Sequence, residues 1–164
     1  MNASSYHIEV DLARQVLKLL DGEKLLQQYL VSTAKNGAGE TMDSECTPRG
    51  RHVIAEKIGD QQALNTVFVG RRASGETYSS ELRAKYPERD WILTRILWLR
   101  GEEAGRNLHD KVDTYNRYIY IHGTPDDVEL GKPGSHGCIR MGNEDIVELF
   151  DLVQEGTRVN IREN

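Results

Sequence analysis

The first part of the chain alternates between apolar and polar residues, which predicts a β-strand followed by a hairpin. The apolar side chains of the first segment fall on every second position: Tyr6, Ile8, Val10 and Leu12. A period of two is typical of a strand with one buried face. Two apolar segments, 15–20 and 24–33, then flank Asp21-Gly22, a dipeptide that favours a type I′ turn. A helix over 12–20 also fits the spacing, but Gly22 would interrupt it, so we expect the hairpin.

The middle of the chain predicts further strands separated by polar segments. Strands are expected at three segments: 51–58, 64–70 and 91–99. Residues 35–50 are polar and rich in Gly, Ser and Thr, and a loop of that length is uncommon unless it is functional. A short helix is expected at 80–86, where Pro87 would end it, and a second loop at 101–110.

Residues 115–122 (YNRYIYIH) alternate again and predict another strand. Ile119 and Ile121 would share one face of it. The other face would carry the polar set: Tyr118, Tyr120 and His122. Tyr120 is therefore expected on the same side as His122, where it could form the wall of a cleft.

The C-terminal region carries the clearest helix. Asn143 is expected as its N-cap, and Gly156 is expected to close it. One apolar stripe runs along the helix: Ile146, Leu149, Phe150 and Val153. A last strand is expected at 157–162. Many short strands with one good helix predict a mainly β fold, a sandwich or barrel with a helix near the C-terminus, in a single domain over residues 1–164.

Composition and charge restrict the function classes. The 164 residues are 38% hydrophobic and 29% charged, with a net charge of −5 and no run of Lys or Arg. Binding to nucleic acid or to an anionic membrane surface is therefore not expected, and no apolar stretch is long enough for a membrane span. The start has no basic n-region or apolar h-region, so we expect a cytoplasmic protein, or a periplasmic one if a leader precedes this sequence.

The two cysteines differ in their surroundings. Cys46 lies in the polar segment MDSECTP and is expected to be a surface loop residue. Cys138 lies in SHGCIR, next to Ser, His, Gly and Arg. An inert structural cysteine is usually enclosed by bulky apolar residues. Cys138 is therefore the candidate reactive thiol.

The residues around Cys138 suit a nucleophile. If 135–140 is extended, then His136, Cys138 and Arg140 share one face, while Gly134 and Gly137 leave room for a substrate to approach. A thiol with an ordinary pKa near ~8.5 is mostly protonated at pH 7, so it needs a base or an ion pair with an imidazole.

Two histidines could serve that thiol. His136 is only two residues away along an extended segment, which places its ring poorly for in-line proton transfer. His122 ends a different strand and precedes Gly123, so the fold can bring it across from a neighbouring strand. We therefore expect His122 to be the general base.

Other interpretations of these residues stay open at this point. A zinc site could use His122, His136 and Cys138, with a fourth ligand drawn from a small set: Asp126, Asp127 or His109. The triplet around Cys138 could also be structural, and Arg140 could be a plain surface charge. The other histidines are expected to be ordinary surface or strand residues: His7, His52 and His109.

The chemistry-bearing segments resemble a known family. Residues 121–124 (IHGT) and 135–141 (SHGCIRM) resemble the catalytic signature of the L,D-transpeptidases, the YkuD domain. The opening segment 6–33 resembles the first strands of that family, and residues 47–50 (TPRG) resemble its TPxG loop. Two details depart from the commonest pattern: the gap between the two signature segments is short, and His52 stands where an aromatic residue often follows the loop.

The resemblance implies roles for individual residues. Cys138 would be the nucleophile and His122 the base, oriented by the carbonyl of Gly123. His136 would shape the site, and the backbone N–H groups of Gly137 and Cys138 would form the oxyanion hole. Arg140 would hold a substrate carboxylate. The remaining expected substrate contacts are Tyr120, Thr124 and Ser135.

The resemblance also implies a substrate. It would be a peptidoglycan stem peptide or muropeptide, opened at the bond between the L-centre of diaminopimelate and D-alanine. No cofactor and no metal would be needed, and carbapenem-type β-lactams would acylate the thiol. Because no export signal is seen, we expect hydrolysis to a tripeptide, an L,D-carboxypeptidase activity. The alternatives are a periplasmic cross-linking transpeptidase and an inactive module that only binds stem peptides.

Overall fold

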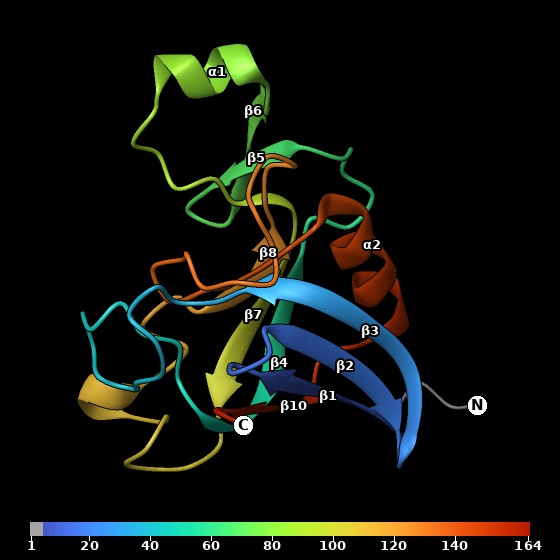
Figure 1. The fold of residues 1–164 in the computed structure, drawn as a ribbon, viewed down its shortest axis with the longest axis vertical. Coiled ribbons are helices and arrows are strands. Elements are labelled where there is room, and N and C mark those ends of the chain that lie inside the picture. The colour runs from blue at the N-terminus through green and yellow to red at the C-terminus, as the bar shows by residue number, and fades with distance from the viewer. Residues whose placement is uncertain (1–4) are drawn as a thin grey trace.

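The computed structural model describes residues 5–164, so residues 1–4 of the expected domain lie outside the described residues. Its regular structure is mostly strand, as Figure 1 shows. The elements in chain order are β1 (Tyr6–Asp11), β2 (Val16–Asp21), β3 (Lys24–Ser32), β4 (Gly50–Ile58), β5 (Thr66–Val69), β6 (Arg72–Thr77), α1 (Ser80–Lys85), β7 (Leu93–Gly101), the 3-10 helix η2 (Asp110–Val112), β8 (Tyr120–Gly123), β9 (Ile139–Met141), α2 (Asn143–Leu152) and β10 (Arg158–Arg162).

The strands close into a barrel. The hydrogen-bonded order runs β4-β10-β1-β2-β3-β9-β8-β7, and β4 also pairs with β7, which completes the circle. The barrel is mixed, because β1 pairs with β10 and β8 with β9 in parallel, whereas the other pairs in the circle are antiparallel. Closure leaves these strands without free edges. The mainly β barrel with a helix near the C-terminus is therefore confirmed.

One continuous apolar core fills the barrel and the space beneath α2. Residues such as Ile8, Leu17 and Ile121 are fully buried in it. All four residues of the expected helical stripe are buried in the same core: Ile146, Leu149, Phe150 and Val153. The helix packs on β7 and β8 (Figure 1), and β8 is one of the two strands of the candidate site. The β5–β6 hairpin and α1 stand at one end of the barrel, beyond β7.

The two hairpins differ from the expectation in detail. In the first hairpin Asp21 pairs with Lys24, so the central turn residues are Gly22 and Glu23. Gly22 has a φ of 61°, and a glycine at the first central position is typical of a type II′ turn. The second strand of the β5–β6 hairpin, β6, was not expected, because its sequence RASGET has no apolar alternation.

The expected strand 115–122 forms only at its end, as β8. The preceding residues form turns, and Tyr118 adopts a φ of 58°. The extended segment expected at 135–140 also fails, because Gly137 adopts a φ of 133° and β9 begins only at Ile139. Tyr118 and His136 therefore do not continue the faces of the strands that follow them.

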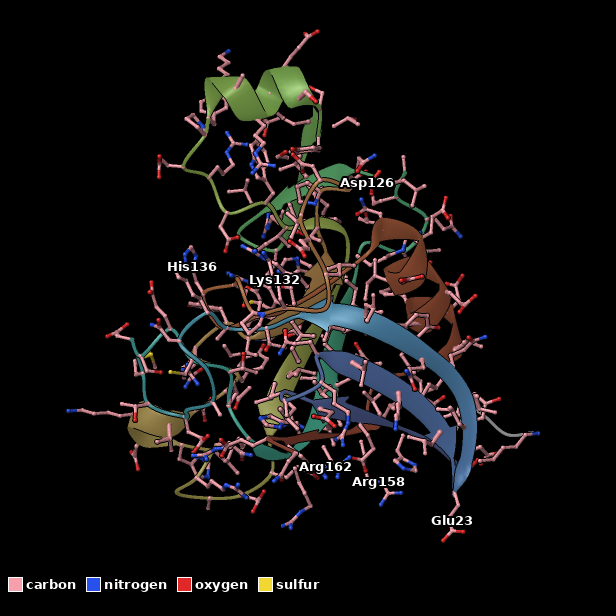
Figure 2. The ribbon with its side chains drawn as sticks, viewed as in Figure 1. Glu23, Asp126, Lys132, His136, Arg158 and Arg162 are labelled. Carbon is pink, nitrogen blue, oxygen red and sulfur yellow. The ribbon has the colours of Figure 1, made fainter. Side chains whose placement is uncertain are left out.

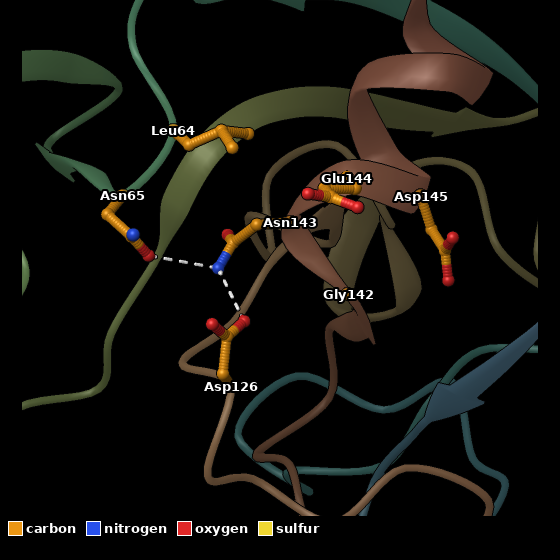
Figure 3. A pocket seen from close by; sticks show the side chains of 7 residues that line it. All are labelled: Leu64, Asn65, Asp126, Gly142, Asn143, Glu144 and Asp145. Carbon is orange, nitrogen blue, oxygen red and sulfur yellow. Dashed lines mark hydrogen bonds between the residues drawn. The ribbon is translucent and has the colours of Figure 1, made fainter.

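Asn143 is the first residue of α2 and not its N-cap, which is Gly142. Its side chain is buried and links three segments instead. The amide donates to Thr124 O and Asn65 Oδ1, each at 3.0 Å, and its oxygen accepts from Thr94 Oγ1 at 2.5 Å. Figure 3 shows this amide pointing toward Asn65 and Asp126 across a cavity of about 380 Å³. The bonds tie the start of α2 to β7 and to the segment after β8.

No helix within residues 5–164 combines the length and the apolar character required to cross a lipid bilayer.

Candidate active site

The parallel pairing of β8 with β9 brings the two chemistry-bearing segments together. His122 lies opposite Arg140, and Ile121 lies opposite Ile139. Cys138 directly precedes β9, so its thiol lies at the end of the pair beside Tyr120. The register thus places the histidine and the cysteine on neighbouring segments of the sheet, which is the arrangement that the sequence predicts.

The thiol of Cys138 is held between two backbone groups. Its S–H donates to the carbonyl of Tyr118 at 3.4 Å, and its sulfur accepts from the N–H of Tyr120 at 3.3 Å. Burial raises the pKa of Cys138, although the N–H of Tyr120 and the charge of Arg140 oppose the rise. The thiol is therefore protonated at neutral pH and depends on a base to become a nucleophile.

His122 is completely buried and its tautomer is fixed. Nδ1 lies 2.7 Å from the carbonyl oxygen of Gly123, so Nδ1 carries the proton and donates it. Nε2 then keeps its lone pair free to accept a proton. Burial lowers the pKa of His122, against the opposing charge of Asp90, so the imidazole is neutral at pH 7. Burial of the two groups thus shifts both pKa values toward a neutral thiol and a neutral imidazole.

Gly123 must be a glycine for steric reasons. A Cβ atom there would lie 2.6 Å from Leu93 O and 2.6 Å from Asn143 Oδ1. The close approach fixes the peptide whose carbonyl orients His122.

Ser135 and Thr47 hold the turn that presents Cys138. The Ser135 hydroxyl donates to Cys138 O at 2.6 Å and accepts from Gly137 N at 3.2 Å. Thr47 Oγ1 donates to Gly137 O at 2.9 Å. Ser135 is buried, so its hydroxyl shapes the turn and does not face a substrate, contrary to our expectation. The N–H of Gly137 would have to leave Ser135 in order to bind an oxyanion.

Arg140 and His136 converge on an acidic residue that the sequence did not suggest. Arg140 Nη2 donates to Asp90 Oδ1 at 3.2 Å, and Nη1 donates to Gly134 O at 3.2 Å. His136 Nδ1 lies 3.8 Å from Asp90 Oδ2. The Arg140 side chain is 15% exposed, whereas that of His136 is 63% exposed and projects away from the ribbon in Figure 2. Asp90 belongs to a polar segment before β7, where no pattern marks it.

A cleft of about 220 Å³ lies beside these residues. Its walls include Thr124, His136 and Arg140 from the β8–β9 region and Asp90 from the segment before β7. Arg83 of α1 forms the far wall and pairs with Asp127 at 2.6 Å, which spans the rim. Thr124 thus lies where the sequence predicted a substrate contact.

Tyr120 does not line this cleft. Its ring is buried in a cluster with Trp98, Phe68 and Ile96, and its hydroxyl accepts from Arg71 at 3.1 Å. The cluster that contains it packs against Cys138.

Cys46 lies closer to the site than its place in the sequence suggests. Its carbonyl accepts from Arg117 Nη2 at 2.7 Å, and a Cβ atom on Gly137 would lie 3.3 Å from that carbonyl oxygen. The Cys46 thiol itself points to other acceptors, Asn36 O and Ser44 O, at 3.6 Å each. The backbone of Cys46 therefore supports the turn around Cys138.

The donors considered for zinc are not gathered into one site. Over residues 5–164, no group of three or more His, Cys, Asp or Glu side chains is placed to hold a metal ion. His52, expected to be ordinary, is fully buried, with Nδ1 on Gly50 O at 3.0 Å and Nε2 on Thr114 Oγ1 at 2.9 Å.

Fold and site together define a closed mixed β-barrel that presents a cysteine and a histidine from two adjacent parallel strands. Residues 5–161 match the family model of the L,D-transpeptidase catalytic domain, YkuD. The chain belongs to this family.

Individual relatives agree with this assignment. The probable L,D-transpeptidase YbiS of Escherichia coli is 51% identical over 110 residues, which cover 63% of this chain and 34% of that protein. The L,D-transpeptidase of Mycobacterium smegmatis has a similar fold, with a TM-score of 0.58 and 17% identity over 96% of this chain and 58% of that one. The structure of the L,D-transpeptidase LdtMt1 in complex with imipenem gives a TM-score of 0.57 and 16% identity, over 96% and 59%. The chain spans only about a quarter to a third of the curated relatives it matches.

Proposed function

We propose that this protein transfers the acyl group of a peptidoglycan stem peptide through a thioester on Cys138. The observation that carries the proposal is the fixed tautomer of His122. With Nδ1 committed to Gly123, the basic Nε2 is available on the strand next to the thiol. Membership of the L,D-transpeptidase family supports a stem peptide as the substrate.

In the first step Cys138 Sγ attacks the carbonyl carbon that joins the L-centre of diaminopimelate to D-alanine. The thiol proton passes to His122 Nε2, and the carbonyl oxygen becomes an oxyanion within reach of the N–H groups of Gly137 and Cys138. The intermediate then collapses. The imidazolium returns its proton to the departing amine, D-alanine leaves, and a thioester remains.

In the second step we propose water as the acceptor. His122 takes a proton from water as it attacks the thioester, the carbon–sulfur bond breaks, and the thiol is restored with that proton. An amine acceptor would instead give a cross-link.

Arg140 is the proposed partner of a substrate carboxylate. It is bonded to Asp90 in the structure, so a substrate carboxylate would have to share or replace that contact. A bidentate guanidinium–carboxylate pair would then orient the peptide in the cleft.

The experiment is incubation with a soluble diaminopimelate tetrapeptide, with products identified by mass spectrometry. Tripeptide and free D-alanine in equal amounts, with few dimers, are expected. Mainly cross-linked dimers would contradict water as the acceptor. Tight binding without any product would favour the inactive binding module.

A further inference from the structure

Cys138 packs against an aromatic cluster, and that cluster carries a cation. Arg71 Nη1 donates to the hydroxyl of Tyr120 at 3.1 Å. The guanidinium lies 5.1 Å from the ring centre of Trp98 and 4.8 Å from that of Tyr118. Tyr120 and Tyr118 are also the residues whose backbones hold the thiol. The cation is therefore linked to the nucleophile through two residues that contact both.

Both Arg71 and Tyr118 occupy costly backbone conformations. Arg71 sits in the β5–β6 turn with a φ of 65°, and Tyr118 sits before β8 with a φ of 58°. Bulky residues seldom adopt positive φ angles. Residues that do so cluster at binding and catalytic sites, where the surrounding structure enforces the conformation. Here the two angles bring a guanidinium and a half-exposed phenol ring, 53% accessible, to face each other.

Arg71 also differs from the arginines of the cleft in its partners. Arg83, Arg89 and Arg140 each pair with a carboxylate, at distances from 2.6 to 3.2 Å. In the part of the chain that the structure describes, no carboxylate lies within the 4.0 Å of an ion pair to Arg71. Arginine has five N–H donors, and the Tyr120 hydroxyl uses one of them. The half-buried guanidinium thus keeps donors for a ligand.

We propose that Arg71, which lies over the rings of both Trp98 and Tyr118, forms an anion subsite that takes a carboxylate of the stem peptide. The inference deepens the proposed function and rests on it. A planar guanidinium packed on aromatic rings is preorganised to bind a carboxylate through two hydrogen bonds. The attraction between the two charges is stronger where the rings exclude water. The subsite lies at the aromatic cluster that packs against Cys138.

Two carboxylates of the substrate have this chemistry. One is the terminal carboxylate of D-alanine, and the other is on the side chain of diaminopimelate. The test therefore compares three peptides: the diaminopimelate tetrapeptide, the same peptide ending in D-alaninamide, and the same peptide with lysine in place of diaminopimelate.

The variants are Arg71→Met, which keeps the packing and removes the charge, and Arg71→Lys, which restores a cation. Arg72→Met is the matched control, since Arg72 is the exposed neighbour on the same hairpin. Steady-state kinetics should show that Arg71→Met lowers kcat/KM for the tetrapeptide at least tenfold, mainly through KM. The wild type should lose activity on the peptide that lacks the carboxylate that Arg71 binds, which identifies that carboxylate. Arg71→Met should no longer distinguish this peptide from the tetrapeptide. Arg71→Lys should recover part of the loss, and Arg72→Met should match the wild type.

The outcomes separate this subsite from the function it rests on. A wild-type protein that opens none of the peptides contradicts the proposed function itself. An active wild type whose preferences persist unchanged in Arg71→Met contradicts the subsite. If Arg71→Met does not fold, as judged by its thermal transition, Arg71→Gln, which also removes the charge, decides: a reduced preference between the peptides supports the subsite, and an unchanged preference contradicts it.

Discussion

His122 illustrates how a single residue gains its role from its surroundings. Its proton acceptor, Nε2, is available because Gly123 holds Nδ1. Loss of a general base typically costs about 10²–10⁴-fold in rate. His122→Ala is therefore expected to slow acylation by that amount with little change in KM, measured by single-turnover release of D-alanine.

His136→Ala serves as the comparison for that variant. His136 is exposed and touches Asp90 only at 3.8 Å, so its loss is expected to affect the rate less. Acylation at the wild-type rate in His122→Ala, with an inactive His136→Ala, would mean that the two roles are reversed.

Among individual residues, the sequence predicted those that lie in the two signature segments, 121–124 and 135–141. Cys138, His122 and Arg140 were predicted in this way. Asp90 and Arg71 were not, because they reach the site through the pairing of β7 with β8 and through a turn whose φ angles are not evident from residue types. Ser135 was found but given the wrong contact, because a hydroxyl in a tight turn bonds its own backbone.

Among the elements, the long loop between β3 and β4 supports the turn of Cys138. The sequence predicted this loop, and its length indicated a function. The sequence did not predict the contact of the loop with Gly137. Thr47 makes that contact: its buried hydroxyl accepts from Ala34 N at 3.0 Å and donates to Gly137 O at 2.9 Å. The loop and the turn are therefore one unit.

Thr47→Val keeps the shape of the side chain and removes both bonds. Leaving a buried backbone group without a partner costs about 1–3 kcal/mol. We expect urea unfolding to show a loss of that size, together with slower acylation. Thr41→Val, at an exposed position of the same loop, should change neither. Wild-type stability and rate in Thr47→Val would show that the loop does not hold the turn.

For the whole molecule, the apolar pattern predicted a mainly β fold because it records which strand faces are buried. It could not decide between sandwich and barrel, since that depends on the β4–β7 and β1–β10 pairings between distant segments. The ends of β8 and β9 were also misjudged, because Tyr118 and Gly137 leave the extended conformation despite an alternating sequence.

Barrel closure also buries His52, with consequences for stability. Burial lowers the pKa of His52 to about 4, whereas the unfolded chain has a histidine pKa near ~6.5. Between these values the unfolded state binds more protons, so stability present above pH 6.5 is lost as the pH falls toward 4.

We expect this histidine to account for about 2 kcal/mol of the loss in unfolding free energy between pH 7 and pH 5. Urea titrations at both pH values should show that His52→Gln loses about 2 kcal/mol less unfolding free energy than the wild type between pH 7 and pH 5. His109→Gln, at an exposed site, should keep the wild-type loss. Equal losses in wild type and His52→Gln would contradict a buried neutral His52.

The central claim is that Cys138 forms the covalent acyl intermediate, and intact-protein mass spectrometry after incubation with imipenem tests it most directly. The wild type and Cys46→Ala should each gain the mass of one imipenem per chain, on a peptide containing Cys138, and Cys138→Ala should gain none. An adduct on Cys46, or an adduct retained in Cys138→Ala, would contradict the account.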